Sequence, residues 1–296
     1  MMMTTARSST SRVSWDGITV NRNTKSKNRR RAFVAAAVLL AGGVQLHSPP
    51  AAAQAVRTAM DANERALERA RDQLSRDPSD LRALREGVQA AMRLGRIDLA
   101  ATYAQRAQQL APGDAHITAA RGAIEIHRGR PRQGLALFEQ ADMAGLPENV
   151  FVSDRALGYD LLGDQPSAQY YYAIANRLNP NDETLRRYAL SLSIIGDYDT
   201  GAAMLKPLLN IGDRPAWRMQ AFMLAINGRG DEAVEVLNRI LPSDVAAELT
   251  PYLLQMPNLT RAQQAAAANL GIFPSLAQAG NSAAEAQRAK RRRPGD

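Results

Sequence analysis

The chain has 296 residues, no cysteine and a formal net charge of +8. Without cysteine it can form neither disulfide bonds nor thiolate metal sites, and it has no thiol for lipidation. The positive charge lies at the two ends of the sequence: residues 1–55 hold eight basic residues against one acidic residue, and residues 288–293 hold five more basic residues. The part between them has no basic stripe, so we expect no nucleic-acid partner.

The first 55 residues have the layout of a secretory signal peptide. Three arginines at positions 29–31 precede an apolar run at positions 32–44, and a small-x-small cleavage site ends at Ala55. We therefore expect residues 1–55 to be an N-terminal region that is removed near Ala55, which leaves a periplasmic protein with no stable membrane span. An uncleaved N-terminal anchor is the alternative, and the general secretory and twin-arginine export routes both stay open.

Prolines and glycines recur over residues 78–180 at a spacing of 34 residues or a multiple of it. The prolines are Pro78, Pro112 and Pro180, and the glycines are Gly95, Gly129 and Gly163. A fixed period with this punctuation is typical of an array of helical hairpins. We expect each glycine to end the first helix of a hairpin with a positive φ. Asp80, Asp114 and Asp182, two residues after the prolines, are predicted to cap the next helix.

Small residues recur behind the glycines, which predicts two closely packed antiparallel helices in each unit. They are Ala100, Gly134 and Ala168, followed seven residues later by Ala107, Ala141 and Ala175, with Ala104, Phe138 and Tyr172 between them. The pattern resembles the tetratricopeptide repeat (TPR) family, whose glycine, alanine, alanine and proline positions are taken in the first unit by Gly95, Ala100, Ala107 and Pro112.

The resemblance implies an all-α, right-handed superhelical solenoid with a concave groove lined by the first helix of each unit. We expect about five units and a capping helix in residues 56–242, a C-terminal helical cap in residues 243–275, and a disordered basic tail in residues 276–296. Residues 259–274 resemble a module of exported alphaproteobacterial TPR proteins, several of which continue into a peptidoglycan-binding SPOR domain. No segment of that size follows here, so no residue is assigned that role.

The TPR register also implies a set of residues that face the groove. They are Arg82, Arg85, Gln89, Arg93, His116, His127, Asp154, Arg186, Arg187 and Arg218, together with Ser153 and Asp160. The arginines could contact an acidic partner, and a solvated helix face is the open alternative for each of them. His116 and His127 are three helical turns, or about 16 Å, apart, which is too far for a shared metal ion.

The sequence offers no catalytic constellation. It has no Gly-rich phosphate loop, no Gly-x-Ser-x-Gly elbow and no His-Glu-x-x-His motif, so we expect no enzyme activity, cofactor or metal. We predict a protein-interaction adaptor of the bacterial cell envelope that binds a peptide segment or helix in its groove. The alternative is a structural cell-wall-associated factor that uses its basic tail. Tyr172 is expected to be buried, and Tyr170 or Tyr171 could anchor an interface.

Overall fold

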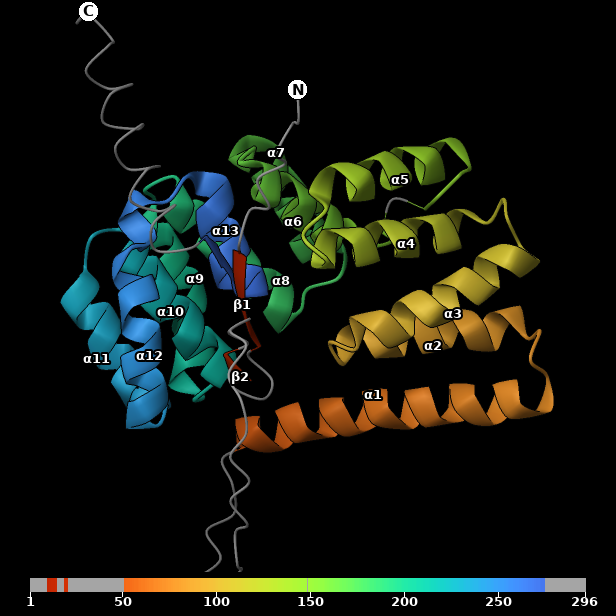
Figure 1. Cartoon of the computed structure of the whole chain (residues 1–296), viewed down its shortest axis with the longest axis horizontal. Coiled ribbons are helices and arrows are strands. Elements are labelled where there is room, and N and C mark those ends of the chain that lie inside the picture. The colour runs from red at the N-terminus through yellow and green to blue at the C-terminus, as the bar shows by residue number, and fades with distance from the viewer. Residues whose placement is uncertain (1–9, 15–18, 21–50, 148, 275–296) are drawn as a thin grey trace, which may run out of the picture.

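The computed structural model describes residues 10–14, 19–20, 51–147 and 149–274, with side chains from residue 62 onward (Figure 1). The apolar run of the predicted signal peptide and the predicted basic tail lie outside the described residues. Most of the described chain is helical. The helices are α1 (Ala51–Arg76), α2 (Leu81–Arg93), α3 (Ile97–Leu110), α4 (Ala115–His127), α5 (Pro131–Met143), α6 (Val152–Leu162), α7 (Gln165–Leu178), α8 (Asp182–Ile194), α9 (Tyr198–Asn210), α10 (Arg214–Ile226), α11 (Gly230–Ile240), α12 (Ser243–Leu254), the 3-10 helix η1 (Met256–Asn258) and α13 (Arg261–Leu270).

Ten of these helices form five consecutive hairpins: α2 with α3, α4 with α5, α6 with α7, α8 with α9, and α10 with α11. Helix α1 packs against α2 at the front of the array, and α12 packs against α11 at its end. The first helices of successive hairpins also contact one another, as α2 does with α4 and α8 with α10. The all-α solenoid of TPR-like hairpins predicted from the sequence is therefore confirmed.

The predicted turn chemistry is mostly confirmed. Gly95, Gly129 and Gly163 follow α2, α4 and α6 with φ values of 68°, 76° and 79°. Asp80 and Asp114 cap α2 and α4, each through a hydrogen bond of 3.0 Å from a backbone amide three residues later.

The predicted cap at Asp182 is wrong by one residue. Asn181 accepts the hydrogen bond from the amide of Thr184 at 2.9 Å instead. Its backbone is extended, with φ −154° and ψ 157°, as a capping residue requires, whereas Asp182 is already the first helical residue. The Asp182 carboxylate still lies in the first turn, where the helix dipole favours negative charge.

Small residues bring the paired helices close together, as predicted. A Cβ atom placed on Gly122 of α4 would lie 2.8 Å from the carbonyl oxygen of Gly134 in α5, so neither helix has room for a side chain there. Ala100 and Ala168 are fully buried at the corresponding positions of the neighbouring units. Phe138 is buried in the space between helices. The small residues that recur every 34 residues therefore correctly predict the close packing of the two helices in a hairpin.

A small sheet is a feature that the sequence did not predict. Strand β1 (Thr10–Ser14) pairs antiparallel with β2 (Thr19–Val20) on one side and with β3 (Ile272–Pro274) on the other. Ser11 lies opposite Phe273 in this register. Strands β1 and β2 belong to the segment assigned to the signal peptide, and α1 begins at Ala51, before the predicted cleavage site. No helix among the described residues has both the length and the apolar character needed to cross a membrane.

Candidate functional site

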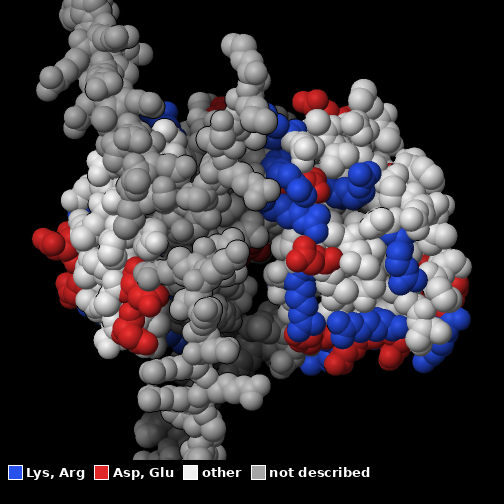
Figure 2. All heavy atoms as spheres, viewed as in Figure 1, with Lys and Arg blue, Asp and Glu red and all other residues white. Residues whose placement is uncertain are grey.

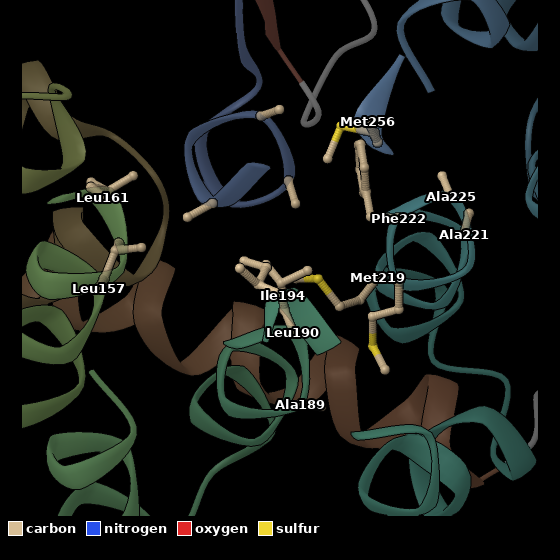
Figure 3. Close-up of a cluster of buried hydrophobic side chains, with 14 of the residues drawn as sticks. Leu157, Leu161, Ala189, Leu190, Ile194, Met219, Ala221, Phe222, Ala225 and Met256 are labelled. Atoms are coloured by element: carbon tan, nitrogen blue, oxygen red, sulfur yellow. The ribbon is translucent and has the colours of Figure 1, made fainter. Parts of the chain in front are cut away.

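The first helices of the five hairpins, α2, α4, α6, α8 and α10, form one continuous surface, which we call the inner face. The chain folds back after α12, and α13 lies against three of these helices, α6, α8 and α10. Figure 3 shows α13 between Leu161 of α6 on one side and Met256 of η1 on the other, above Ile194 of α8. We call α6, α8 and α10 the covered half of the inner face, and α2 and α4 the open half.

Helix α13 is held in the covered half by close packing. Its residues Ala265, Ala267 and Ala268 have no exposed surface. A Cβ atom on Gly163, at the end of α6, would lie 3.6 Å from the side chain of Ala262. Alanine therefore serves here as it does between hairpins: it lets two helices approach without a gap.

Polar groups and aromatic rings fix the two ends of α13. Thr260 and Gln263 form a capping box at its start. Gln264 donates a hydrogen bond to the carbonyl of Met256 at 2.9 Å. After α13, Phe273 of β3 packs between two rings, with its centroid 6.3 Å from that of Phe222 and 5.2 Å from that of Tyr252. The helical segment predicted to follow the array thus occupies part of the surface that the sequence assigned to a ligand.

Two of the predicted groove arginines form ion pairs with the capping aspartate of the next first helix. Arg85 of α2 pairs with Asp114, and Arg186 of α8 pairs with Asp213 at 3.1 Å. These two aspartates are also the residues that cap α4 and α10. A charge-assisted bond to a capping carboxylate ties one unit to the next, so these arginines hold the array together.

His127, Asp154 and Arg187 come together at the junction of α4, α6 and α8. The His127 Nε2 atom lies 2.8 Å from Asp154 Oδ1, and an Arg187 nitrogen lies 3.4 Å from the same oxygen. Glu183 pairs with the other side of the Arg187 guanidinium, which is only 9% exposed. The structure thus brings these three predicted groove residues into direct contact.

Two pKa values in this cluster reflect its balance of burial and charge. Burial alone raises the pKa of Asp154, but the hydrogen bonds and charges of His127 and Arg187 outweigh it and hold that pKa below its ordinary value. Burial acts to lower the pKa of Arg187, and the carboxylates of Glu183 and Asp154 outweigh it and raise that pKa. The cluster is therefore a charged junction that stabilises three units at once.

Asp160 differs from the expectation that it faces the groove, because it is fully buried. Ser191 donates a hydrogen bond to its Oδ1 atom at 2.7 Å, while Oδ2 has no hydrogen-bond partner among the described residues. Burial raises the pKa of Asp160 to about 7, although the nearby Tyr172 and Gln165 side chains act in the opposite direction. The TPR register placed Asp160 on the first helix of its unit. The side chain, however, is directed toward Ser191 of α8 and not into the groove.

The open half keeps its predicted side chains accessible. Arg82, Gln89 and Arg93 are exposed, and Arg82 makes only a surface ion pair of 3.0 Å with Glu86. Together with Arg85 they form a stripe with spacings of three and four residues along α2, and the ion pair of Arg85 orients this stripe toward α4. His116 of α4 and Arg218 of α10 are half-buried.

Charged atoms are visible mainly over the N-terminal part of the molecule in Figure 2, on the right, where α1 to α5 lie in Figure 1. Among the described residues no group of three or more histidine, aspartate or glutamate side chains is placed to hold a metal ion. The geometry of the inner face is that of a contact surface: an open stripe of cations and amides beside a half filled by a helix.

No protein-family model matches the chain, and no curated protein matches it. Similar solved structures include YrrB, a TPR protein with an unusual peptide-binding site, at 17% identity and a TM-score of 0.40 over 60% of this chain and 96% of that one. The Cut9–Hcn1 hetero-tetramer of the APC/C is similar at 14% identity and a TM-score of 0.49. That match covers 82% of this chain and 49% of that one. The TPR domain of P58(IPK) is similar at 14% identity and a TM-score of 0.26, over 75% of this chain and 69% of that one.

Proposed function

We propose that this protein is a non-enzymatic interaction module, an adaptor that binds a peptide segment or helix of a partner on the open half of its inner face. One observation carries the proposal: the chain's own helix α13 already packs against the covered half of the same surface. The open half is built from the same first helices of hairpins as the covered half, and a helix laid against such a surface is a common mode of peptide recognition.

The partner segment is expected to be acidic. Arg82 and Arg93 are the exposed cations of the stripe on α2, with Gln89 between them as a hydrogen-bond donor and acceptor. Because Arg85 is committed to Asp114, it is excluded from the contact. Glu86 offsets part of the charge of Arg82, so the interaction is modest in strength and depends on ionic strength.

The test is in-cell cross-linking of the tagged full chain, with partners identified by mass spectrometry. The variant Arg82→Glu/Arg93→Glu is compared with Arg132→Glu/Arg177→Glu, which reverses two exposed charges on the second helices α5 and α7. We expect the first variant to lose a partner that the wild type and the second variant both retain. Retention of that partner by both variants would place the binding site elsewhere.

The cell-envelope location is part of the proposal and is supported by the signal-peptide pattern. Removal of residues 1–55 would take β1 and β2 away and leave the edge of β3 unpaired. N-terminal sequencing of the protein from the periplasmic fraction is the test. A start near Val56 supports export with cleavage, and a start at the first residue contradicts it.

A structural, cell-wall-associated factor is the second candidate, and it is favoured by the five basic residues at positions 288–293. Such a tail would contact peptidoglycan or other anionic envelope polymers. Deletion of these residues should then abolish sedimentation of the full chain with purified sacculi. Sedimentation that survives the deletion rules out this role of the tail.

A further inference from the structure

A pocket of about 290 Å³ lies between the loop after α5, the start of α6 and the outer side of α7. Its lining includes Asp142, Val152, Arg155, Tyr170, Tyr171 and Ile174. None of these residues belongs to the predicted groove set, and none belongs to α13. We propose that this pocket is a second binding site, which takes one arginine or lysine side chain of a partner protein.

The aromatic residues of the pocket contact one another and Tyr159. Tyr171 stacks on Tyr159 with a centroid distance of 5.4 Å and an interplanar angle of 3°. Tyr170 meets Tyr171 edge to face, with a centroid distance of 5.2 Å and an angle of 81°. Tyr170 is 62% exposed in spite of this contact. An exposed aromatic ring is suited to receive a cation, because the face of the ring carries negative potential.

Arg155 also lines the pocket, but its guanidinium is already engaged by other residues of this chain. The guanidinium carbon lies 5.0 Å from the centroid of the Phe138 ring and 5.3 Å from that of the Tyr171 ring. It donates a hydrogen bond of 2.7 Å to Asp142 Oδ1, and its side chain is only 15% exposed. The Asp142 side chain, by contrast, is 46% exposed, so its carboxylate is accessible to a donor from outside.

The lining therefore combines an exposed carboxylate, an exposed aromatic ring and the apolar side chains of Val152 and Ile174. A long cationic side chain matches all three features, since its methylene stem packs on apolar surface while its head reaches the carboxylate and the ring. Arginine fits better than lysine because its planar guanidinium stacks on a ring and bonds a carboxylate at the same time. The volume is below that of most small-molecule sites, which supports occupation by a single side chain.

The experiment is an NMR titration of the full chain with four blocked tripeptides, Ala-Arg-Ala, Ala-Lys-Ala, Ala-Gln-Ala and Ala-Glu-Ala, whose ends carry no charge. The methyl signals of Val150, Val152 and Ile174 report on the pocket. We expect saturable shifts with the arginine and lysine peptides, and binding of the glutamine and glutamate peptides at least tenfold weaker. Equal binding of the glutamate peptide, or no shift with any peptide, overturns the proposal.

Variants separate the pocket from general attraction of cations to the protein. Tyr170→Ala removes the exposed ring and leaves Arg155 and Asp142 in place, and Asp142→Asn removes the carboxylate charge. Each is expected to weaken arginine-peptide binding at least fivefold, whereas Asp199→Asn, an exposed carboxylate on α9, leaves it unchanged. Binding that survives Tyr170→Ala contradicts the site. Arg82→Glu/Arg93→Glu should not affect this titration, so the two proposed sites fail independently.

Discussion

The two halves of the inner face are built from the same helical unit but have opposite surfaces. In the covered half Leu161, Ile194 and Phe222 are buried, in the same hydrophobic core as the alanines of α13. In the open half the corresponding stripe on α2 carries Arg82, Gln89 and Arg93, which remain exposed. A repeat scaffold fixes the backbone of both halves, and only the side chains decide whether a half recruits a segment of its own chain or stays free for another.

The largest expected effect of this difference is on stability. Ala268→Glu places a charge at a fully buried position of α13. Because a buried, unpaired carboxylate is very costly, we expect the substitution to lower the free energy of unfolding by about 4 kcal/mol or more, or to release α13 from the inner face. Urea unfolding followed by circular dichroism measures the first result, and hydrogen exchange of the α13 amides measures the second.

Gln89→Glu is the matched change in the open half. Gln89 is exposed, so the same new charge should change the free energy of unfolding by no more than about 0.5 kcal/mol. Similar costs for the two substitutions would mean that α13 is not packed as tightly as its buried alanines indicate.

The next effect depends on pH and concerns Asp160, which lies behind the covered half. Its folded-state pKa of about 7 lies above the ordinary value of 3.8. Below pH 4 the carboxyl is protonated in both states and costs nothing. Between pH 4 and pH 7 it ionises in the unfolded chain only, and above pH 7 the folded protein must hold a buried charge. Asp160→Asn should therefore stabilise the protein at pH 8 by up to about 4 kcal/mol, because the pKa is raised by about 3 units and each unit corresponds to about 1.4 kcal/mol.

The same substitution should have little effect on stability at pH 4. Thermal unfolding at both pH values, with Asp98→Asn as the control, measures the difference. The side chain of Asp98 on α3 is 96% exposed, so its replacement should give no comparable gain at pH 8. A destabilising effect of Asp160→Asn at pH 8 would show that the carboxylate charge is needed where it lies.

A third effect distinguishes buried from exposed ion pairs. Asp154→Asn removes the carboxylate shared by His127 and Arg187, whereas the ion pair of Arg187 with Glu183 remains. We expect a loss of about 1–3 kcal/mol at pH 7, less than for a fully isolated buried charge. Because the folded-state pKa of Asp154 is lowered, its contribution is present above its ordinary pKa and disappears as the pH falls through the folded-state value.

Glu86→Gln is the matched change in the open half, since the Arg82–Glu86 pair lies on the surface. Its expected cost is below about 0.5 kcal/mol, and added salt should reduce that cost further. Chemical unfolding of both variants at low and high salt makes the comparison. If the cost of Asp154→Asn fell with salt as steeply as that of Glu86→Gln, the junction would be as solvated as the surface pair.

The sequence predicts this fold well because each hairpin is a local unit. Its turns need a glycine with a positive φ, such as Gly129, and its two helices need small residues where they approach closely, as at Gly122 and Gly134. Such residues can be recognised in the sequence by their repeat spacing. The caps at Asp80 and Asp114 follow from the same local rules.

The site was harder to predict, because its contacts join distant parts of the chain. Nothing local about the alanines of α13 indicates that they pack on α6 and α8, and the same composition suits a terminal cap. The register identified Arg186 and Arg187 as groove residues, but their partners Asp213 and Asp154 lie 27 and 33 residues away. A search for carboxylates about one repeat away from each arginine would have found these pairs.

The smallest expected effect on stability is also the one that best separates folding from binding. Arg82→Ala/Arg93→Ala removes two exposed side chains of the open half, and only the surface pair with Glu86 is lost, so the free energy of unfolding should change by less than about 0.5 kcal/mol. Arg85→Ala should cost more, about 1 kcal/mol, because Asp114 then loses an inter-unit partner. Chemical unfolding should therefore show the larger loss of stability for Arg85→Ala, and cross-linking should show the larger loss of partner for Arg82→Ala/Arg93→Ala. If partner loss instead followed Arg85, the open stripe would be a solvated helix face, and the charged junctions between units would carry the recognition.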